Sequence, residues 1–151
     1  MSQTNILSAP PHPRPYAHHE NAVYEWMSAL GAENVCTSPE ILRRYGRSCM
    51  NRTREPVAVL LPESVEKVQA ILTVSREHEI PVYPVSRGLN WGYGSAAPVQ
   101  HGNAVIDFRK MNRIIEVDDD LAYAVVEPGV SQQQLSAFLE QHHPQLMMDV
   151  T

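Results

Sequence analysis

The chain has 151 residues, of which 43% are hydrophobic and 19% are charged, and its formal net charge is −5. This length is typical of a single domain, and the composition excludes a disordered or fibrous chain. Binding to phosphate-rich polymers requires clustered Lys and Arg, whereas the 12 basic residues here are scattered along an acidic chain. We therefore expect no nucleic-acid partner.

No apolar run approaches the roughly 20 residues that a membrane span requires. The first residues lack the basic and apolar regions of a secretory signal and lead into a proline-rich stretch. These features predict a cytoplasmic protein that does not enter a membrane.

Cys36 and Cys49 are the only cysteines, and their spacing matches neither a zinc site nor a disulfide framework. They are interpreted as reduced structural thiols. The seven histidines include two adjacent pairs, but adjacent side chains on a helix point in different directions. The pairs therefore lack the spacing of a metal-binding helix, and we expect no metal site.

Residues 1–50 are expected to form an N-terminal arm followed by two short helices. Four of the twelve prolines fall in the first seventeen residues, which favours an extended arm. Apolar spacing predicts a helix over 18–30 that ends at Gly31, and a second helix that begins after Ser38 and ends at Gly46. The arginines around the end of the second helix are interpreted as a solvated basic rim: Arg43, Arg44, Arg47, Arg52 and Arg54.

Residues 51–151 are expected to form an α+β domain that is incomplete at its C-terminal end. Short apolar runs at 57–61 and 82–85 predict strands, and Ser64 caps a helix between them that ends near His78. Strand, helix and strand within about thirty residues indicate a βαβ unit. The predicted inner face of the helix consists of Val65, Val68, Ile71, Leu72 and Ser75.

The pattern after the second strand predicts an antiparallel meander, with strands at 104–108, 113–117 and 121–127. Three consecutive aspartates at 118–120 form a turn between the last two strands. Ser131 then caps a helix that runs to His143, and an apolar run at 146–148 predicts one further strand. Because that last strand has no partner, we expect the chain to be the front part of a larger enzyme.

The run PVSRGLNWGYGSAAP at 84–98 carries the strongest chemical signal. Three glycines in seven residues, directly after a strand, allow positive φ angles and leave backbone N–H groups uncovered by side chains. Successive exposed amides form a nest for anions, most often phosphate. Neither a Rossmann helix nor the Gly-Lys-Ser/Thr of a P-loop follows, so the loop amides alone would hold the phosphate.

Side chains within this run support the same interpretation. Ser86, Asn90 and Ser95 add neutral donors, and Arg87 adds a charge that could lie on a diphosphate. The alternative is a glycine-rich surface hairpin. Trp91 and Tyr93 weigh against it, because an exposed tip rarely carries two large aromatic side chains with nothing to cover.

A second segment, VVEPGVS at 125–131, ends a strand, turns sharply and begins a capped helix. Taken alone, this segment is an ordinary connection between a strand and a helix. Its significance comes from its place in the order of segments: a βαβ unit, a glycine-rich loop, a meander, and then Glu-Pro-Gly-Val.

In this order the two segments resemble the flavin-binding half of the vanillyl-alcohol oxidase and p-cresol methylhydroxylase (PCMH) family, over about residues 50–151. The resemblance implies a PCMH-type FAD-binding subdomain with FAD as cofactor. It places the following residues at FAD: Pro84, Val85, Ser86, Arg87, Gly88, Leu89, Asn90, Gly92, Tyr93, Gly94 and Ser95, together with Glu127, Pro128, Gly129 and Val130.

The resemblance also implies an FAD-dependent oxidoreductase, an oxidase or a dehydrogenase, that removes a hydride from a para-substituted phenol or related aromatic. Tyr93 matches the family tyrosine that binds the substrate phenolate, and is the expected catalytic residue. A hydroxyl aimed at the phenol would favour its ionised form. The other interpretation of Tyr93 is a ring packed against flavin or core. The remaining active-site residues of the family lie beyond Thr151, so this fragment alone is expected to be inactive.

Two alternatives stay open. The protein could be an FAD-dependent oxidase of a sugar, hydroxy acid or natural-product intermediate, including oxidative decarboxylation, or the chain could be an isolated nucleotide-binding module without enzymatic activity. The expected partners are a small aromatic substrate and further copies of the chain in a homo-oligomer, and the electron acceptor is either dioxygen or a cytochrome subunit.

Overall fold

The computed structural model describes residues 19–48, 53–88 and 95–148. Its centre is a mixed four-stranded sheet in which three strands run parallel and one edge strand runs antiparallel to its neighbour. The order across the sheet is β1 (Val35–Cys36), β2 (Ala58–Leu60), β4 (Ala104–Asp107) and β3 (Val82–Val85).

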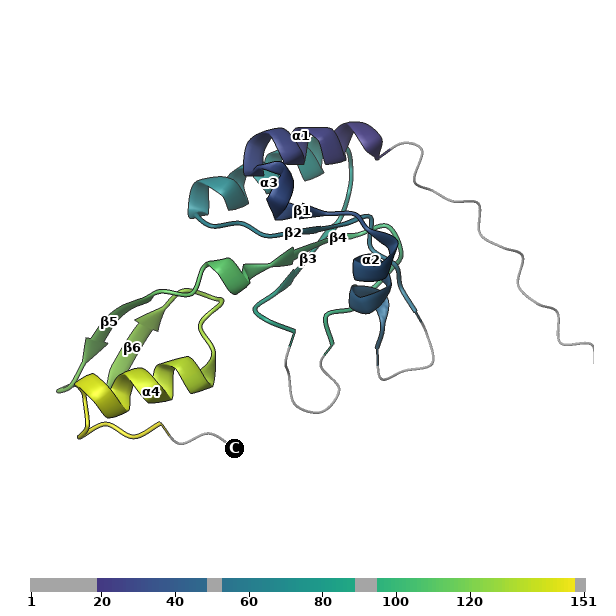
Figure 1. Cartoon of the computed structure of the whole chain (residues 1–151). Coiled ribbons are helices and arrows are strands. Elements are labelled where there is room, and N and C mark those ends of the chain that lie inside the picture. The colour runs from purple at the N-terminus through teal and green to yellow at the C-terminus, as the bar shows by residue number, and fades with distance from the viewer. Residues whose placement is uncertain (1–18, 49–52, 89–94, 149–151) are drawn as a thin grey trace, which may run out of the picture.

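Helices cover both faces of this sheet (Figure 1). One face is covered by α1 (Glu20–Leu30) and α3 (Val65–Glu77), and the other by α2 (Pro39–Gly46). Short 3₁₀ turns, η2 (Ala32–Asn34) and η3 (Phe108–Lys110), follow α1 and β4. None of the helices in the described ranges combines the length and apolar character needed to cross a bilayer.

The predicted helix ends are confirmed. Gly31 ends α1 with φ of +94°, a left-handed angle that side chains disfavour, and its N–H donates to the carbonyl of Met27. Side-chain oxygens of Ser38, Ser64 and Ser131 each accept a backbone N–H at the start of the following helix. Local sequence therefore sets where these helices begin and end.

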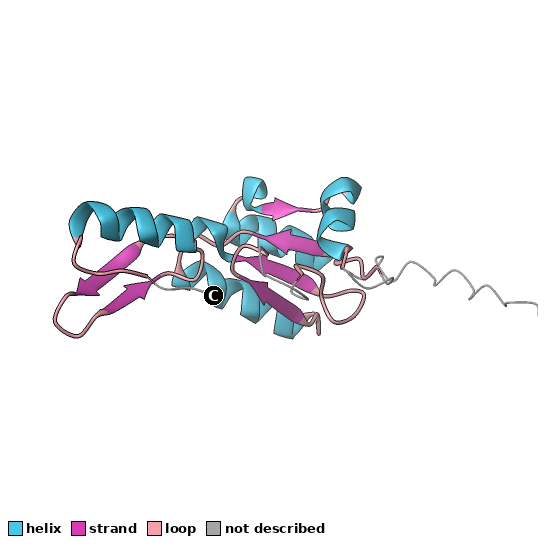
Figure 2. Ribbon diagram, turned by 90° about the horizontal axis from the view of Figure 1, so that it is seen from below, coloured by secondary structure: helices cyan, strands magenta, loops and turns pink. Residues whose placement is uncertain are grey.

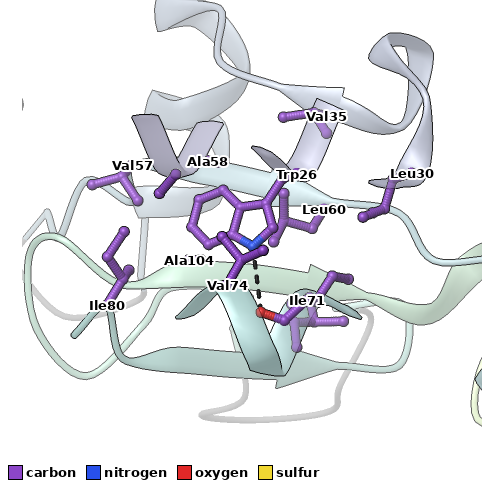
Figure 3. Close-up of a cluster of buried hydrophobic side chains, with 12 residues drawn as sticks. Trp26, Leu30, Val35, Val57, Ala58, Leu60, Ile71, Val74, Ile80 and Ala104 are labelled. Atoms are coloured by element: carbon purple, nitrogen blue, oxygen red, sulfur yellow. Dashed lines mark hydrogen bonds between the residues drawn. The ribbon is translucent and has the colours of Figure 1, made fainter. Parts of the chain in front are cut away.

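The larger hydrophobic core lies between the sheet and the α1–α3 layer (Figure 3). Trp26 is completely buried there, and its indole Nε1 donates to the backbone carbonyl of Ile71 at 3.4 Å. Side chains from three strands complete this core, including Leu60, Val35 and Ile106. A smaller cluster on the opposite face joins Tyr45 of α2 to Val59, Val85 and Val105.

The alternation of side chains along β4 places a carboxylate on the α2 face. Ala104 and Ile106 pack in the larger core, whereas Val105 packs in the cluster with Tyr45. Successive side chains of a strand point to opposite faces, so Asp107 lies on the same face as Val105. This carboxylate is fully buried at the carboxyl end of the strand.

The α+β class and the βαβ unit are confirmed, but the predicted meander has two strands rather than three. The run at 104–107 joins the first sheet between β2 and β3. All four of its residues are buried, which is typical of a central parallel strand covered on both faces. The antiparallel pair consists of β5 (Ile114–Asp118) and β6 (Tyr123–Val126).

Two smaller predictions are wrong. Residues 146–148 form no strand. In α3, Val65 and Leu72 are exposed, while Val74 joins Ile71 and Ser75 on the buried face. The helix meets the sheet along a narrow stripe, so apolar residues at its margins stay in solvent.

A second unit follows β4 through η3. Helix α4 (Gln132–His142) lies beside the β5–β6 hairpin (Figure 2). The amide of Gln134 donates to the carbonyl of Asn112 at 2.8 Å, and His143 pairs with Asp119 at 2.7 Å. These contacts hold the two ends of the helix against the ends of the hairpin.

Candidate functional site

The site begins where two adjacent parallel strands end. β3 ends at Val85, which is in register with Asp107 at the end of β4. The glycine-rich run therefore leaves the sheet directly beside the buried carboxylate. Open α/β sheets bind ligands at the carboxyl ends of their strands, and this edge is the corresponding place here.

The described start of the glycine-rich run has the backbone geometry that its sequence predicts. Gly88 has φ of +66°, and a Cβ at this position would come 3.0 Å from the Cβ of Ala96. Any larger residue would meet both a conformational and a steric penalty. Leu89, Asn90, Gly92, Tyr93 and Gly94 lie outside the described residues, and so does Trp91.

A hollow of about 320 Å³ adjoins this start of the run. Among the described residues, four arginines and no acidic residue line it; the described lining consists of Arg44, Tyr45, Arg47, Arg87, Gly88, Ser95, Ala96 and Arg109. Four of the twelve basic residues of an acidic chain thus converge on one site. Arginine recognises phosphate oxygens through paired N–H donors, so the hollow is suited to a diphosphate.

Arg44 and Arg47 are exposed, as expected for the predicted basic rim, and both also line the hollow. Helix α2 packs on the sheet face that carries Val105, and its end therefore meets the carboxyl ends of β3 and β4. Arg54, which was also assigned to this rim, instead donates from Nη1 to the carbonyl oxygen of Pro98 at 3.5 Å.

Three side chains form a hydrogen-bonded cluster beneath the hollow. The Tyr45 hydroxyl donates to Asp107 Oδ2 at 2.5 Å. Arg109 donates from Nε to Asp107 Oδ1 at 3.0 Å, and from Nη2 to Asp107 Oδ2 and to the Tyr45 oxygen, both at 2.7 Å. None of these three residues belongs to a motif recognised in the sequence.

The charges of this cluster reinforce one another. Burial, followed by the hydrogen bond to Asp107, raises the pKa of Tyr45 well above its ordinary value. Burial alone would raise the pKa of Asp107, but hydrogen bonds from Arg109 and Tyr45 outweigh it and lower that pKa. Asp107 is therefore ionised, Tyr45 is neutral, and Arg109 is charged at neutral pH.

The Glu-Pro-Gly-Val segment is joined to the glycine-rich run by Arg87, whose Nη1 donates to the carbonyl of Gly129 at 3.3 Å. Pro128 is exposed, and Val130 is half-buried with its N–H bonded to the carbonyl of Glu127. The two segments that the sequence analysis singled out thus make direct contact.

Glu127 itself is engaged by a neighbour. Its carboxylate accepts hydrogen bonds from the backbone N–H of Arg113 at 2.7 Å and from Nε and Nη2 of the same residue at 3.0 and 2.7 Å. The hydrogen bonds from the guanidinium, and then from the backbone N–H, lower the pKa of Glu127. The structure therefore assigns this carboxylate to closing the hairpin, and the residue's place at a ligand stays a prediction.

A larger hollow, of about 640 Å³, lies between the start of α1, β1 and α2. Its described lining holds none of the residues expected at FAD, and its walls include the apolar side chains of Val23, Leu42 and Val57. Its lining offers no cluster of donors for a phosphate. The arginine-lined hollow is therefore the candidate site.

A family model described as an FAD binding domain matches residues 56–151. This chain belongs to that family. The match covers the central sheet from β2 onward, the glycine-rich run and the whole β5–β6–α4 unit. FAD is accordingly the cofactor of this family, and the arginine-lined hollow is the candidate site for it in this chain.

Individual relatives place this FAD-binding domain in the PCMH-type family. The flavoprotein subunit of 4-cresol dehydrogenase (hydroxylating) from Pseudomonas putida is 38% identical over 84% of this chain and 25% of its own length. 1'-Carboxy-chondrochloren decarboxylase from Chondromyces crocatus is 37% identical over 87% of this chain and 24% of its own length.

A solved structure of p-cresol methylhydroxylase with substrate bound superposes with a TM-score of 0.83 at 35% identity. The superposition covers 89% of this chain and 27% of that one. This similarity confirms the predicted PCMH-type fold. The FAD-binding domain described here spans about a quarter of the length of the relatives it matches.

The donor set of the hollow fits the diphosphate of FAD. A dinucleotide diphosphate carries about two negative charges and several acceptor oxygens, and the hollow offers four guanidinium groups without a carboxylate in its lining. The positive φ of Gly88 supplies the backbone geometry from which an amide nest starts. The residues present are therefore compatible with the cofactor of the family.

Proposed function

We propose that this chain is the FAD-binding portion of a flavoprotein oxidoreductase that removes a hydride from a para-substituted phenol or a related aromatic. The convergence of four arginines on the start of the glycine-rich run is the observation that carries the cofactor assignment. The printed names of two relatives, a cresol dehydrogenase and p-cresol methylhydroxylase, support the substrate class.

The residues of the hollow would hold the diphosphate. Arg87 and Arg109 approach it from the ends of β3 and β4, and Arg44 and Arg47 approach from the end of α2. The hydroxyls of Ser86 and Ser95 and the amides from Gly88 onward would add neutral donors. The bound flavin supplies hydride acceptance, while the protein orients and polarises the reacting groups.

Tyr93 would act on the substrate rather than on the diphosphate. A phenolic hydroxyl that donates to the substrate oxygen favours the phenolate. Loss of the phenol proton raises electron density at the para position, so a hydride leaves the para carbon as the quinone methide forms.

The cofactor assignment is tested by the visible spectrum of the protein expressed from its complete gene. We expect a yellow protein with flavin absorption bands, and release of flavin on denaturation if the link is non-covalent. A colourless protein that takes up no FAD would contradict the proposal. Replacing two lining arginines together, Arg44→Met with Arg47→Met, should lower the flavin content relative to the exposed-residue control Arg76→Met.

The substrate class is tested by Tyr93→Phe. Removing one donor to a developing oxyanion typically costs about 10²-fold or more in turnover, and we expect that loss on a para-alkylphenol. The matched control is Tyr24→Phe, which makes the same chemical change at an exposed position of α1. The rate of flavin reduction by the substrate is measured in a single turnover under anaerobic conditions, by the bleaching of the flavin band.

The second candidate function keeps FAD and changes the substrate to a sugar, hydroxy acid or natural-product intermediate, including oxidative decarboxylation. Its support is the 37% identity to a protein named as a decarboxylase. Unchanged turnover in Tyr93→Phe would favour this candidate, because a phenolate donor would then be unnecessary.

The electron acceptor is part of the same proposal. The relative from Pseudomonas putida is named as a flavoprotein subunit, which supports a partner subunit, and we propose a cytochrome in that role. Reoxidation of the reduced protein by air at a rate that matches turnover would instead assign dioxygen. The proposed homo-oligomer is measured by light scattering on the same preparation.

A further inference from the structure

Arg109 is held from behind by two buried side chains, whereas Arg87 is held by the backbone carbonyl of Gly129. Asp107 is fully buried and Tyr45 is 8% exposed, whereas the Arg109 side chain is 40% exposed. The guanidinium therefore joins a buried acceptor pair to the open side of the hollow.

The hydrogen bonds occupy one edge of the Arg109 guanidinium. Its Nε and Nη2 atoms make every hydrogen bond to Asp107 and Tyr45, in the two-pronged arrangement that arginine forms with a carboxylate. Within the described ranges, Nη1 has no hydrogen-bonding partner. Two N–H donors thus remain for a ligand in the hollow that Arg109 lines.

The anchoring also offsets repulsion within the hollow. Four guanidinium groups gathered in about 320 Å³ repel one another, and an unanchored arginine side chain would turn outward to bulk water. The buried carboxylate of Asp107 attracts Arg109, and the Tyr45 hydroxyl bonds to both partners. A side chain already fixed in its binding geometry loses less rotamer freedom when the ligand arrives.

We propose that Asp107 and Tyr45 are positioning residues that hold Arg109 as a preorganised donor for the diphosphate of FAD. The inference rests on the proposed placement of that diphosphate in the arginine-lined hollow. It assigns to the buried Tyr45 a measurable effect on cofactor affinity.

The test is a double-mutant cycle on the protein expressed from its complete gene and obtained without flavin. FAD binding is followed by quenching of flavin fluorescence in the wild type, Tyr45→Phe, Arg109→Met and the double variant. Tyr45→Phe keeps the buried ring and removes only the hydroxyl. The matched control is Tyr24→Phe on the exposed face of α1.

We expect Tyr45→Phe to weaken FAD binding about fivefold to tenfold, and Arg109→Met to weaken it at least tenfold. In the Arg109→Met background, Tyr45→Phe should change the affinity less than twofold, because the hydroxyl then has no guanidinium to hold. A tyrosine that merely stabilises the fold would lower the melting temperature without this coupling to Arg109.

Several outcomes would overturn the inference. An effect of Tyr45→Phe no larger than that of Tyr24→Phe removes the positioning role while the cofactor assignment stands. An equal effect in both Arg109 backgrounds assigns Tyr45 to fold stability alone. A wild-type protein that binds no FAD removes the proposed function together with the inference. If Tyr45→Phe fails to fold, Asp107→Asn with the same cycle gives the second measurement.

Discussion

Gly129 is confined by backbone atoms rather than by side chains. A Cβ at this position would overlap the carbonyl oxygen of Phe108 and would come 2.7 Å from that of Met111. Its N–H already donates to the Met111 carbonyl at 2.8 Å, and its own carbonyl accepts from Arg87. The glycine of the Glu-Pro-Gly turn therefore serves the close approach of two chain segments.

We accordingly expect Gly129→Ala to lower the free energy of unfolding by about 3 kcal/mol, at the upper end of the overpacking range, since backbone cannot move aside cheaply. Urea unfolding of the purified variant measures this. Gly102→Ala is the control: it has φ of +84° and open space around it. The control carries only the left-handed penalty of about 1 to 2 kcal/mol. Equal losses in the two variants would contradict the steric argument.

At the scale of elements, Glu63 connects three segments that are distant in sequence. Its carboxylate pairs with Lys67 of α3 at 3.0 Å and with Lys110 of η3 at 2.9 Å. Lys67 in turn donates to the carbonyl of Leu30 at the end of α1, and Lys110 donates to Asn34. This surface network joins the helix layer to the start of the second unit.

Hydrogen bonds from Lys110 and Lys67 lower the pKa of Glu63 to about 2 from its ordinary 4.5. The folded state thus binds the proton more weakly than the unfolded state, so the stabilisation is complete above pH 4.5 and is lost as the pH falls towards 2. We expect Glu63→Gln to lower the melting temperature at pH 7 but to match the wild type near pH 2.

Thermal unfolding followed by circular dichroism across this pH range measures the effect. Glu77→Gln is the control, because no ion pair of Glu77 is found in the described part of the chain. A difference between wild type and Glu63→Gln that stays constant from pH 7 to pH 2 would show that ionisation of Glu63 contributes nothing to stability.

The elements themselves were largely predictable because their signals are local. Ser38, Ser64 and Ser131 cap helices by bonding to residues three positions away, and Gly31 ends a helix through its own φ angle. The place of β4 was not predictable in this way. Strand pairing depends on distant partners, which the local sequence of a short apolar run does not identify.

The difference between local signals and long-range contacts also explains which parts of the candidate site could be predicted. The glycine-rich run and the Glu-Pro-Gly-Val turn stand out as short motifs, and Arg87 joins them in the structure. The basic hollow combines residues from α2, from the segment after β3 and from η3. Arg44, Arg87 and Arg109, one from each, lie 22 to 65 positions apart in the sequence. Asp107, a charged residue that closes a buried apolar strand, was the one sequence signal that could have indicated it.

At the scale of the whole molecule, the chain consists of two unequal units. The four-stranded sheet is covered on both faces, and β2 and β4 are completely buried (Figure 1). The β5–β6 hairpin is paired only with itself and carries much of the exposed apolar surface. The large exposed apolar side chains of this second unit are Ile115, Leu121, Tyr123, Val125, Val126 and Met147.

The difference in burial between the two units predicts that their backbone amides are protected unequally from hydrogen exchange when the chain of 151 residues is studied alone. A two-stranded hairpin is marginally stable in water, because its hydrogen bonds open without disturbing a larger core. We expect amides of β5 and β6 to exchange with deuterium at least 10²-fold faster than those of β2 and β4, as measured by mass spectrometry of peptic fragments. Ile115→Thr should leave this contrast intact, because its side chain is 61% exposed and contributes little to the packing. Equal protection of the two units would show that α4 and the hairpin form a core as cooperative as that of the sheet, contrary to the exposure of their apolar side chains.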